Sequence, residues 1–158
     1  MTHVPAHEEH FAVRWSDLDA NRHVRNTVFS ELATHTRFRL LESHGFDQAS
    51  FEQLRFGPVM LREEIRYRRE LAFGDDVVVN VTIAGLSDDG SQWRVQQEVG
   101  RSGKQAALLT IDGAWIHLDD RKLIAPPEGL LLILRFLPRI NSFEVLRSML
   151  RNPPAQAA

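Results

Sequence analysis

Hydrophobic and polar residues alternate along most of the chain. Alternation with a period of two places apolar side chains on one face of a strand. It occurs over residues 9–15, 59–71, 77–86, 92–99 and 105–118. Turn signals such as Asp88-Asp89-Gly90 separate the later segments. The pattern therefore predicts a first strand and a later meander of four strands. Within the last strand, Asp112-Gly113 predicts a bulge or a close approach of another group to the backbone.

One long segment, residues 27–44, follows a helical period instead. Asn26 or Thr27 is expected to cap its start, Gly45 fits the residue that follows its last turn, and a loop containing Gly57 and Pro58 is expected beyond it. One strand, one long helix and four strands predict an α+β fold, an antiparallel sheet with the helix packed on it. The helix face expected in the core comprises Phe29, Leu32, Ala33, Thr36, Leu40 and Leu41.

The two ends of the chain differ from this alternating centre. Residues 1–8 are polar and predict a flexible tail, and residues 9–127 form the predicted domain. Residues 128–158 predict a helical extension with two parts: an apolar helix ending at Pro138, and an amphipathic helix over 142–150. Asn141 and Glu144 resemble a capping box for the second helix. We expect this extension to serve packing or a subunit contact.

Composition and charge narrow the possible functions. A chain of 158 residues has the size of a single domain. A formal net charge of −2 argues against a general nucleic-acid binder, and the absence of cysteine excludes disulfides and thiol chemistry. The start of the chain lacks the apolar segment of a signal peptide, and residues 130–134 are too short an apolar run for membrane insertion. We therefore expect a cytoplasmic protein. His3, His7 and His10 do not match a metal-ligand pattern, so no metal is expected.

Candidate chemistry gathers in the polar segment between the first strand and the long helix. Asp17, Asp19, Asn21, His23 and Asn26 fall within ten residues there. The free N–H groups and dipole of a helix N-terminus can stabilise a developing oxyanion, and a neighbouring carboxylate can act as base or nucleophile. The same residue types also build turns and helix caps, which is the role we expect for Asp17. Residue types alone leave both interpretations open.

Two motifs carry a resemblance to a known family. Residues 17–26 read DLDxNxHVxN, and residues 67–70 read YRRE before Gly74-Asp75. In this order the motifs resemble the hotdog-fold thioesterases over residues 9–127. The plant acyl-ACP thioesterases and the small bacterial acyl-CoA thioesterases related to 4-hydroxybenzoyl-CoA thioesterase are nearest in pattern. The resemblance implies a sheet wrapped around one central helix, hydrolysis of an acyl-CoA or acyl-ACP without a cofactor, and a homodimer or homotetramer.

The resemblance also assigns roles to individual residues. Asp19 matches the family's catalytic carboxylate, as nucleophile or as base for the attacking water. Asn21 and His23 match the pair that positions it. The backbone N–H of Asn26 matches the donor that faces the thioester oxygen. Glu70 matches a further acidic residue, although a carboxylate beside an arginine-rich strand is often only an ion-pair partner.

Substrate-binding residues follow less directly. Arg66 and Arg68, on one face of a predicted strand together with Arg62, are expected to hold the phosphates of CoA or of a carrier-protein arm. The alternative is a solvated outer face paired with glutamates. Phe29 stands where the family often has tyrosine, so it is expected to line the substrate site.

Three functions stay open on this sequence. An acyl-CoA thioesterase fits the motifs best, with acyl-ACP as a variant substrate. A hotdog dehydratase would use a histidine with an acid. A protein that binds acyl-CoA as a sensor or scaffold, without catalysis, would not need an unshielded Asp19.

Overall fold

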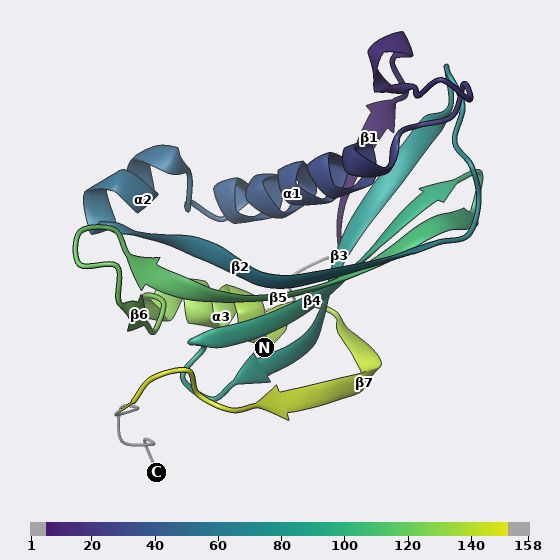
Figure 1. The fold of residues 1–158 in the computed structure, drawn as a ribbon. Coiled ribbons are helices and arrows are strands. Elements are labelled where there is room, and N and C mark those ends of the chain that lie inside the picture. The colour runs from purple at the N-terminus through teal and green to yellow at the C-terminus, as the bar shows by residue number, and fades with distance from the viewer. Residues whose placement is uncertain (1–5, 152–158) are drawn as a thin grey trace.

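The computed structural model describes residues 6–151. Its central helix is α1, Asn26–Ser43. Figure 1 shows α1 lying across one face of a sheet whose strands curl beneath it. In chain order the elements are β1 His7–Ala12, the short 3₁₀ turn η1 Trp15–Asp17, α1, α2 Gln48–Leu54, β2 Phe56–Tyr67, β3 Asp76–Ser87, β4 Gln92–Arg101, β5 Lys104–His117, β6 Leu123–Ile124, α3 Glu128–Phe136 and β7 Arg139–Leu146.

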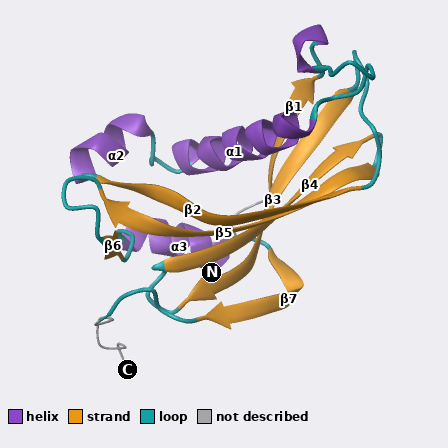
Figure 2. Cartoon of the chain, viewed as in Figure 1, coloured by secondary structure: helices purple, strands orange, loops and turns teal. Residues whose placement is uncertain are grey.

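The sheet has the strand order β1-β3-β4-β5-β2, and these strands pair antiparallel. β6 adds to β5, and β7 runs parallel to β3 beyond the part of β3 that β1 covers. Figure 2 shows α1 and α2 on the same side of this sheet, with β7 far from α1. The α+β class and the helix on the sheet are confirmed. The predicted meander of four strands is wrong in one strand: β3, β4 and β5 form a meander, but β2 pairs with β5 at the end of the sheet and not with β3, its neighbour in the chain.

The core lies between α1 and the sheet. Along β4, the side chains of Trp93, Val95, Gln97 and Val99 are buried and alternate with more exposed ones, as period-two patterning requires. Five of the six helix positions predicted to face the core are buried, and Leu32 is partly buried against them. Burial of this apolar stripe is what holds α1 on the sheet.

The local sequence predicts one end of α1 correctly and the other end wrongly. The predicted cap by Asn26 or Thr27 is wrong, since Arg25 occupies the N-cap and offers no side-chain hydrogen bond to the helix. At the other end Gly45 follows the cap residue with φ of 88°, a left-handed conformation that glycine adopts without a steric cost. That part of the prediction is confirmed.

Two other expectations are wrong, and one helix was not predicted. Gly57 and Pro58, predicted as a loop, lie inside β2, because Pro58 sits on the edge strand where a missing N–H is tolerated. α2 was not predicted; Asp47 caps it by accepting from Ser50 N–H at 2.8 Å. The second C-terminal helix is wrong: residues 139–146 form β7, because pairing with β3 outweighs the capping signal.

The N-terminal tail is shorter than predicted. β1 begins at His7 and pairs with β3 through Val81, which takes His7 and Glu8 out of the tail. His7 contacts Glu9 at 3.1 Å. His3 lies outside the described residues.

Gly113 confirms the predicted close approach. A Cβ built on Gly113 would lie 2.0 Å from the ring of Trp93, so only glycine leaves room for that ring. The alternative expectation was a bulge in β5 itself. The pairing of β2 with β5 does have a bulge near Gly113, but it lies in β2, between Met60 and Arg62. Trp93 also contacts Trp115, with 5.9 Å between ring centroids.

Candidate active site

Asp17 fixes the loop that leads into α1. Its side chain is buried and accepts hydrogen bonds from the backbone N–H of Arg14 at 2.9 Å and from the Arg14 guanidinium at 2.8 Å. Its carbonyl accepts from Arg25 N–H at 2.9 Å. The Arg14 guanidinium holds the pKa of the Asp17 carboxyl below its usual value. These contacts assign Asp17 the structural role expected from the sequence.

Asp19 lies two residues beyond Asp17, in an exposed tight turn. Its Oδ1 accepts from the backbone N–H groups of Asn21 at 2.8 Å and His23 at 3.3 Å. The Asp19 N–H donates to the His23 carbonyl at 2.8 Å, and Arg22 closes the turn with φ of 65°. The carboxylate is therefore held by backbone donors, and the side chains of Asn21 and His23 do not bond to it.

Asn26 is the first residue of α1 and is exposed. No acceptor for its backbone N–H is present within residues 6–151. Arg25 joins the loop to the helix, since its guanidinium donates to the Ser16 carbonyl at 2.6 Å and to Thr27 Oγ1 at 3.0 Å. A helix N-terminus with an uncommitted donor can accept negative charge.

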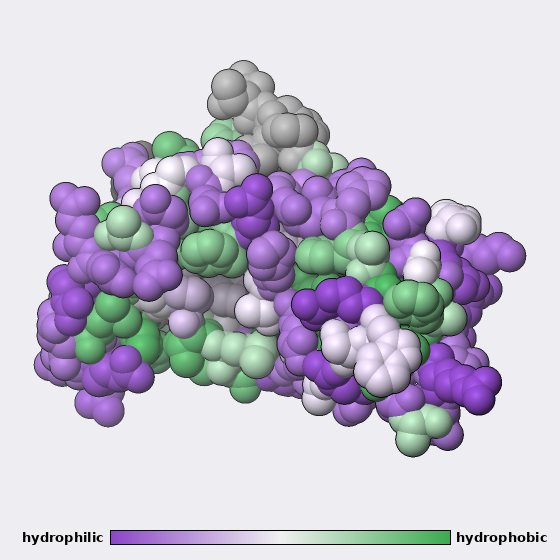
Figure 3. Space-filling view, turned by 90° about the horizontal axis from the view of Figure 1, so that it is seen from above, coloured by the Kyte–Doolittle hydropathy of each residue, from purple (hydrophilic) through white to green (hydrophobic). Residues whose placement is uncertain are grey.

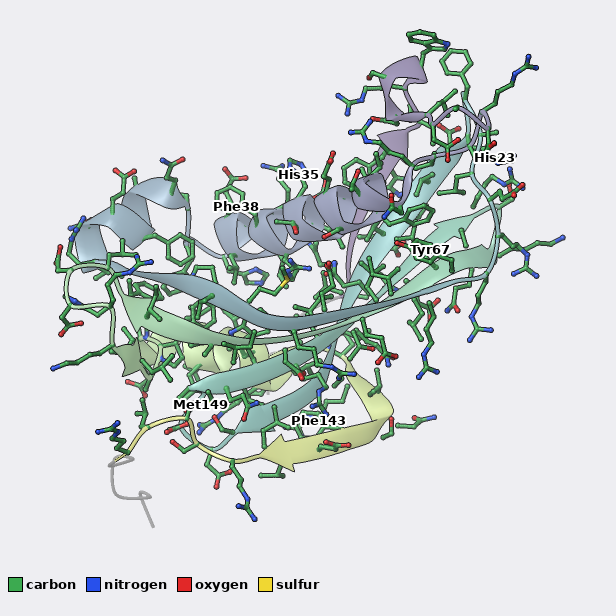
Figure 4. The ribbon with its side chains drawn as sticks, viewed as in Figure 1. His23, His35, Phe38, Tyr67, Phe143 and Met149 are labelled. Atoms are coloured by element: carbon green, nitrogen blue, oxygen red, sulfur yellow. The ribbon has the colours of Figure 1, made fainter. Side chains whose placement is uncertain are left out.

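His23 and Glu70 come together from two separate motifs. His23 Nε2 lies 3.0 Å from Glu70 Oε2, with 39% and 73% of the two side chains exposed. Val24 N–H donates to the Leu71 carbonyl at 2.8 Å, which joins the DLDxNxHVxN loop to the end of the YRRE segment. Figure 4 shows His23 and Tyr67 at the same end of the molecule, with His35 and Phe38 farther along α1.

A cavity of about 610 Å³ opens beside this pair. Phe29 is buried in its wall and meets the ring of Tyr67 edge-on, with 5.3 Å between centroids. Burial raises the pKa of the Tyr67 hydroxyl. The cavity is lined by His23, Val24, Phe29, Tyr67, Arg68, Arg69, Glu70 and Arg101. Asp19, Asn21 and Asn26 lie outside this lining, so the site has a carboxylate turn and a separate pocket.

The predicted arginine patch is divided. Arg68 lines the cavity, and its side chain has no hydrogen bond or ion pair within residues 6–151. Arg66 lies in a different groove and bonds to Glu64 at 2.9 Å. The Arg66 guanidinium lowers the pKa of the Glu64 carboxyl. For Arg66 and Arg62 the alternative of a paired outer face therefore holds.

Sequence reasoning did not assign Tyr67, Arg69 and Arg101 to the site. Tyr67 and Arg69 belong to the YRRE motif, so that motif could have assigned them to the site. Arg101 comes from the end of β4, and nothing in the local pattern connects it to the other lining residues. Arg101 is bound by Asp75 at 2.6 Å.

Residues 6–151 were searched for metal-binding clusters and for helices that could span a membrane. The residues between 6 and 151 contain no group of three or more histidine, cysteine or acidic side chains that could hold a metal ion. Within the same range, no helix is long and apolar enough to cross a membrane.

The fold is that of a single hotdog domain. Residues 13–134 match the thioesterase-like superfamily, and the chain belongs to it. A comparison of the sequence with curated proteins finds no match.

Solved structures of low identity share the fold. A 1,4-dihydroxy-2-naphthoyl-CoA thioesterase from Synechocystis is 16% identical, with a TM-score of 0.74 over 83% of this chain and 96% of its own. A Staphylococcus aureus protein in complex with CoA is 20% identical, with a TM-score of 0.78 over 89% of this chain and 91% of its own. A probable thioesterase from Escherichia coli is 22% identical, with a TM-score of 0.71 over 83% and 98%. These likenesses confirm the hotdog architecture.

Proposed function

We propose that the protein hydrolyses an acyl-CoA to the free acid and CoA. Membership of the thioesterase-like superfamily supports the reaction class. The observation that carries the proposal is the exposed Asp19 carboxylate, held by two backbone N–H groups in the turn that leads into α1. A carboxylate fixed in the loop that leads into a helix can act as a base, and the free N–H groups at the start of that helix can bind an oxyanion.

The steps follow from this arrangement. Asp19 takes a proton from water as the water oxygen bonds to the thioester carbonyl carbon. The carbonyl oxygen becomes an oxyanion, which accepts from Asn26 N–H at the positive end of α1. The C–S bond then breaks, and the thiolate takes the proton back to leave as CoA. Direct attack by Asp19 on the carbonyl carbon, giving an anhydride that water cleaves, would need the same carboxylate.

His23 and Glu70 supply a second polar group for the same reaction. A carboxylate 3.0 Å from Nε2 orients the imidazole, so that His23 can bind or protonate the leaving sulfur. The pair lies in the cavity wall, where Asp19 does not. If this pair rather than Asp19 were the base, His23→Gln would remove turnover and Asp19→Asn would not.

Two arginines at the cavity support CoA as the leaving group. Among residues 6–151 the Arg68 guanidinium at the cavity has no partner, and Arg69 uses only part of its donor capacity on the Gln105 carbonyl, at 2.9 Å. Guanidinium groups bind phosphate oxygens in pairs of hydrogen bonds. The pantetheine phosphate of an acyl carrier protein would use the same contacts. We propose a cytoplasmic location for this reaction.

A second copy of the chain would complete the fold. β2 is the end strand of the sheet path, and the exposed Met60 and Leu61 lie on it. A long unpaired edge with apolar side chains is a favourable surface for pairing with another chain. We propose a homodimer or homotetramer.

The test is release of CoA by the purified protein from acyl-CoAs of 2 to 18 carbons and from benzoyl-CoA and phenylacetyl-CoA. Turnover of at least one of them supports the proposal, and the profile identifies the acyl class. Binding of acyl-CoA without turnover of any member, or of a matched acyl carrier protein, would favour a non-catalytic binding protein.

A further inference from the structure

A second cavity, of about 260 Å³, lies between the far half of α1 and the sheet. Its walls are almost wholly apolar and include Phe51, Trp93, Trp115 and Leu134. An apolar cavity of roughly 150 Å³ is large enough to hold benzene. This cavity therefore has room for a medium-length hydrocarbon chain or a ring system.

Arg37 is the one charged side chain in this lining. Its Nη1 donates to Gln97 Oε1 at 2.6 Å, and its Nη2 donates to Thr34 Oγ1 at 2.9 Å. A guanidinium has five N–H donors. The two acceptors are neutral, so no bound anion compensates the charge, and the remaining N–H donors have no partner within residues 6–151.

Gln97 holds the guanidinium in place. Gln97 is fully buried, and its Nε2 donates to the carbonyls of Ala33 at 3.0 Å and Asn80 at 3.3 Å. These bonds orient its Oε1 toward Arg37. The position of the positive charge is therefore set by the core of the protein.

No carboxylate within residues 6–151 lies within 4.0 Å of the Arg37 nitrogens. Glu63 acts on Arg37 from a greater distance, and both its oxygens are bound by the Ser30 hydroxyl at 2.9 Å. Burial lowers the pKa of Arg37. A desolvated cation without a bound anion is costly to the fold, and a ligand carboxylate would remove that cost.

We propose that this cavity binds a carboxylate with an apolar body, its hydrocarbon against Trp93 and Trp115 and its carboxylate on Arg37. The assignment of the cavity does not depend on the proposed thioesterase activity. Two sources share this chemistry: the far end of an acyl group that carries a second carboxylate, and a separate free carboxylic acid.

The cavity can be reached from the surface. Phe38 belongs to its lining and is 36% exposed, and it lies on α1, away from the β2 edge proposed for pairing with a second copy. Figure 4 shows Phe38 well away from His23 along α1, and Figure 3 shows apolar side chains gathered along the edge that β2 forms. Arg37 lies 11 residues beyond Asn26, which is about 16 Å along the helix axis.

The test compares octanoate with octanol, which have the same chain but different charge. Trp93 and Trp115 line the cavity, whereas Trp15 is 78% exposed, so fluorescence is measured in a Trp15→Phe background. We expect octanoate to bind about tenfold or more tightly than octanol, as a charge-assisted hydrogen bond allows. Arg37→Gln should abolish the preference, and Arg37→Lys should keep most of it.

Arg39→Gln is the matched control, because Arg39 lies on the same helix but pairs with Glu42 at the surface. It should keep the preference. Equal binding of octanoate and octanol to the Trp15→Phe protein, or an unchanged preference in a folded Arg37→Gln variant, would overturn the proposal.

A competition arm separates the two sources. If the ligand is the end of an acyl group, octanoate should compete with an acyl-CoA that carries a terminal carboxylate, and Arg37→Gln should raise the KM of that thioester alone. If the ligand is a separate acid, octanoate should bind equally well with the thioester present. Either result supports the cavity assignment, which the binding comparison alone can overturn.

Discussion

Replacing Gly113 by alanine should destabilise the protein strongly. The new Cβ would lie 2.0, 2.3 and 2.5 Å from three atoms of the Trp93 ring, where ordinary contacts exceed 3.4 Å. The ring would have to move by more than 1 Å, but it is buried and packed against Trp115. Overpacking of this kind costs about 1–3 kcal/mol, and the rigid ring favours the upper end. For a chain of this length, about 3 kcal/mol lowers Tm by about 6–12 °C.

The assay is thermal and urea unfolding followed by tryptophan fluorescence. Gly57→Ala is the matched control: it also lies in a strand, and its new Cβ would meet only Leu118, at 3.5 Å. Alanine there should leave Tm unchanged or raise it slightly, because glycine disfavours strands. A Gly113→Ala variant as stable as Gly57→Ala would refute the packing argument.

Two further predictions concern the loop and the C-terminal strand. Asp17→Asn should cost about 1 kcal/mol at neutral pH, discounted for the solvent around Arg14. The pKa of Asp17 is lower in the folded than in the unfolded protein, so this stabilisation is present above about pH 4 and is lost as the pH falls through the folded pKa. The difference in Tm between the variant and the original protein should therefore shrink in acid. A constant difference would contradict the argument. Ser91→Ala removes the buried hydroxyl that accepts a hydrogen bond from Met149 N–H at 2.9 Å. Amide hydrogen exchange of residues 139–149 should therefore accelerate about tenfold, while that of β4 stays unchanged. Equal protection of residues 139–149 in the variant and the original protein would show that this bond does not hold the segment in place.

Much of the fold could be predicted because its patterns are local. Period-two alternation and Gly-containing turns locate the meander, and the apolar stripe locates α1. β7 could not be predicted in this way, because its strand state depends on pairing with β3, more than fifty residues earlier in the chain. α2 is short, and only its cap at Asp47 marks it.

The residues of the candidate site likewise differ in whether a local pattern or a long-range contact places them. The turn at Asp19 belongs to one continuous segment. Residue types directed attention to that segment, and the resemblance of its motif singled out Asp19. His23 and Glu70 belong to two different motifs, so their contact could be anticipated only by considering both motifs together. Arg101 reaches the cavity through the pairing of β4 with its neighbours, and Arg37 faces its own cavity through Gln97 of β4. Contacts between distant strands have no local signature.

The most direct test of the account is turnover by Asp19→Asn. The asparagine Oδ1 can still accept from the N–H groups of Asn21 and His23, so the turn should persist while the charge is lost. With a thioester that the original protein hydrolyses, we predict that CoA release falls by about 10²–10⁴-fold at an unchanged Tm. Turnover near that of the original protein, in a variant that melts normally, would contradict the role of Asp19.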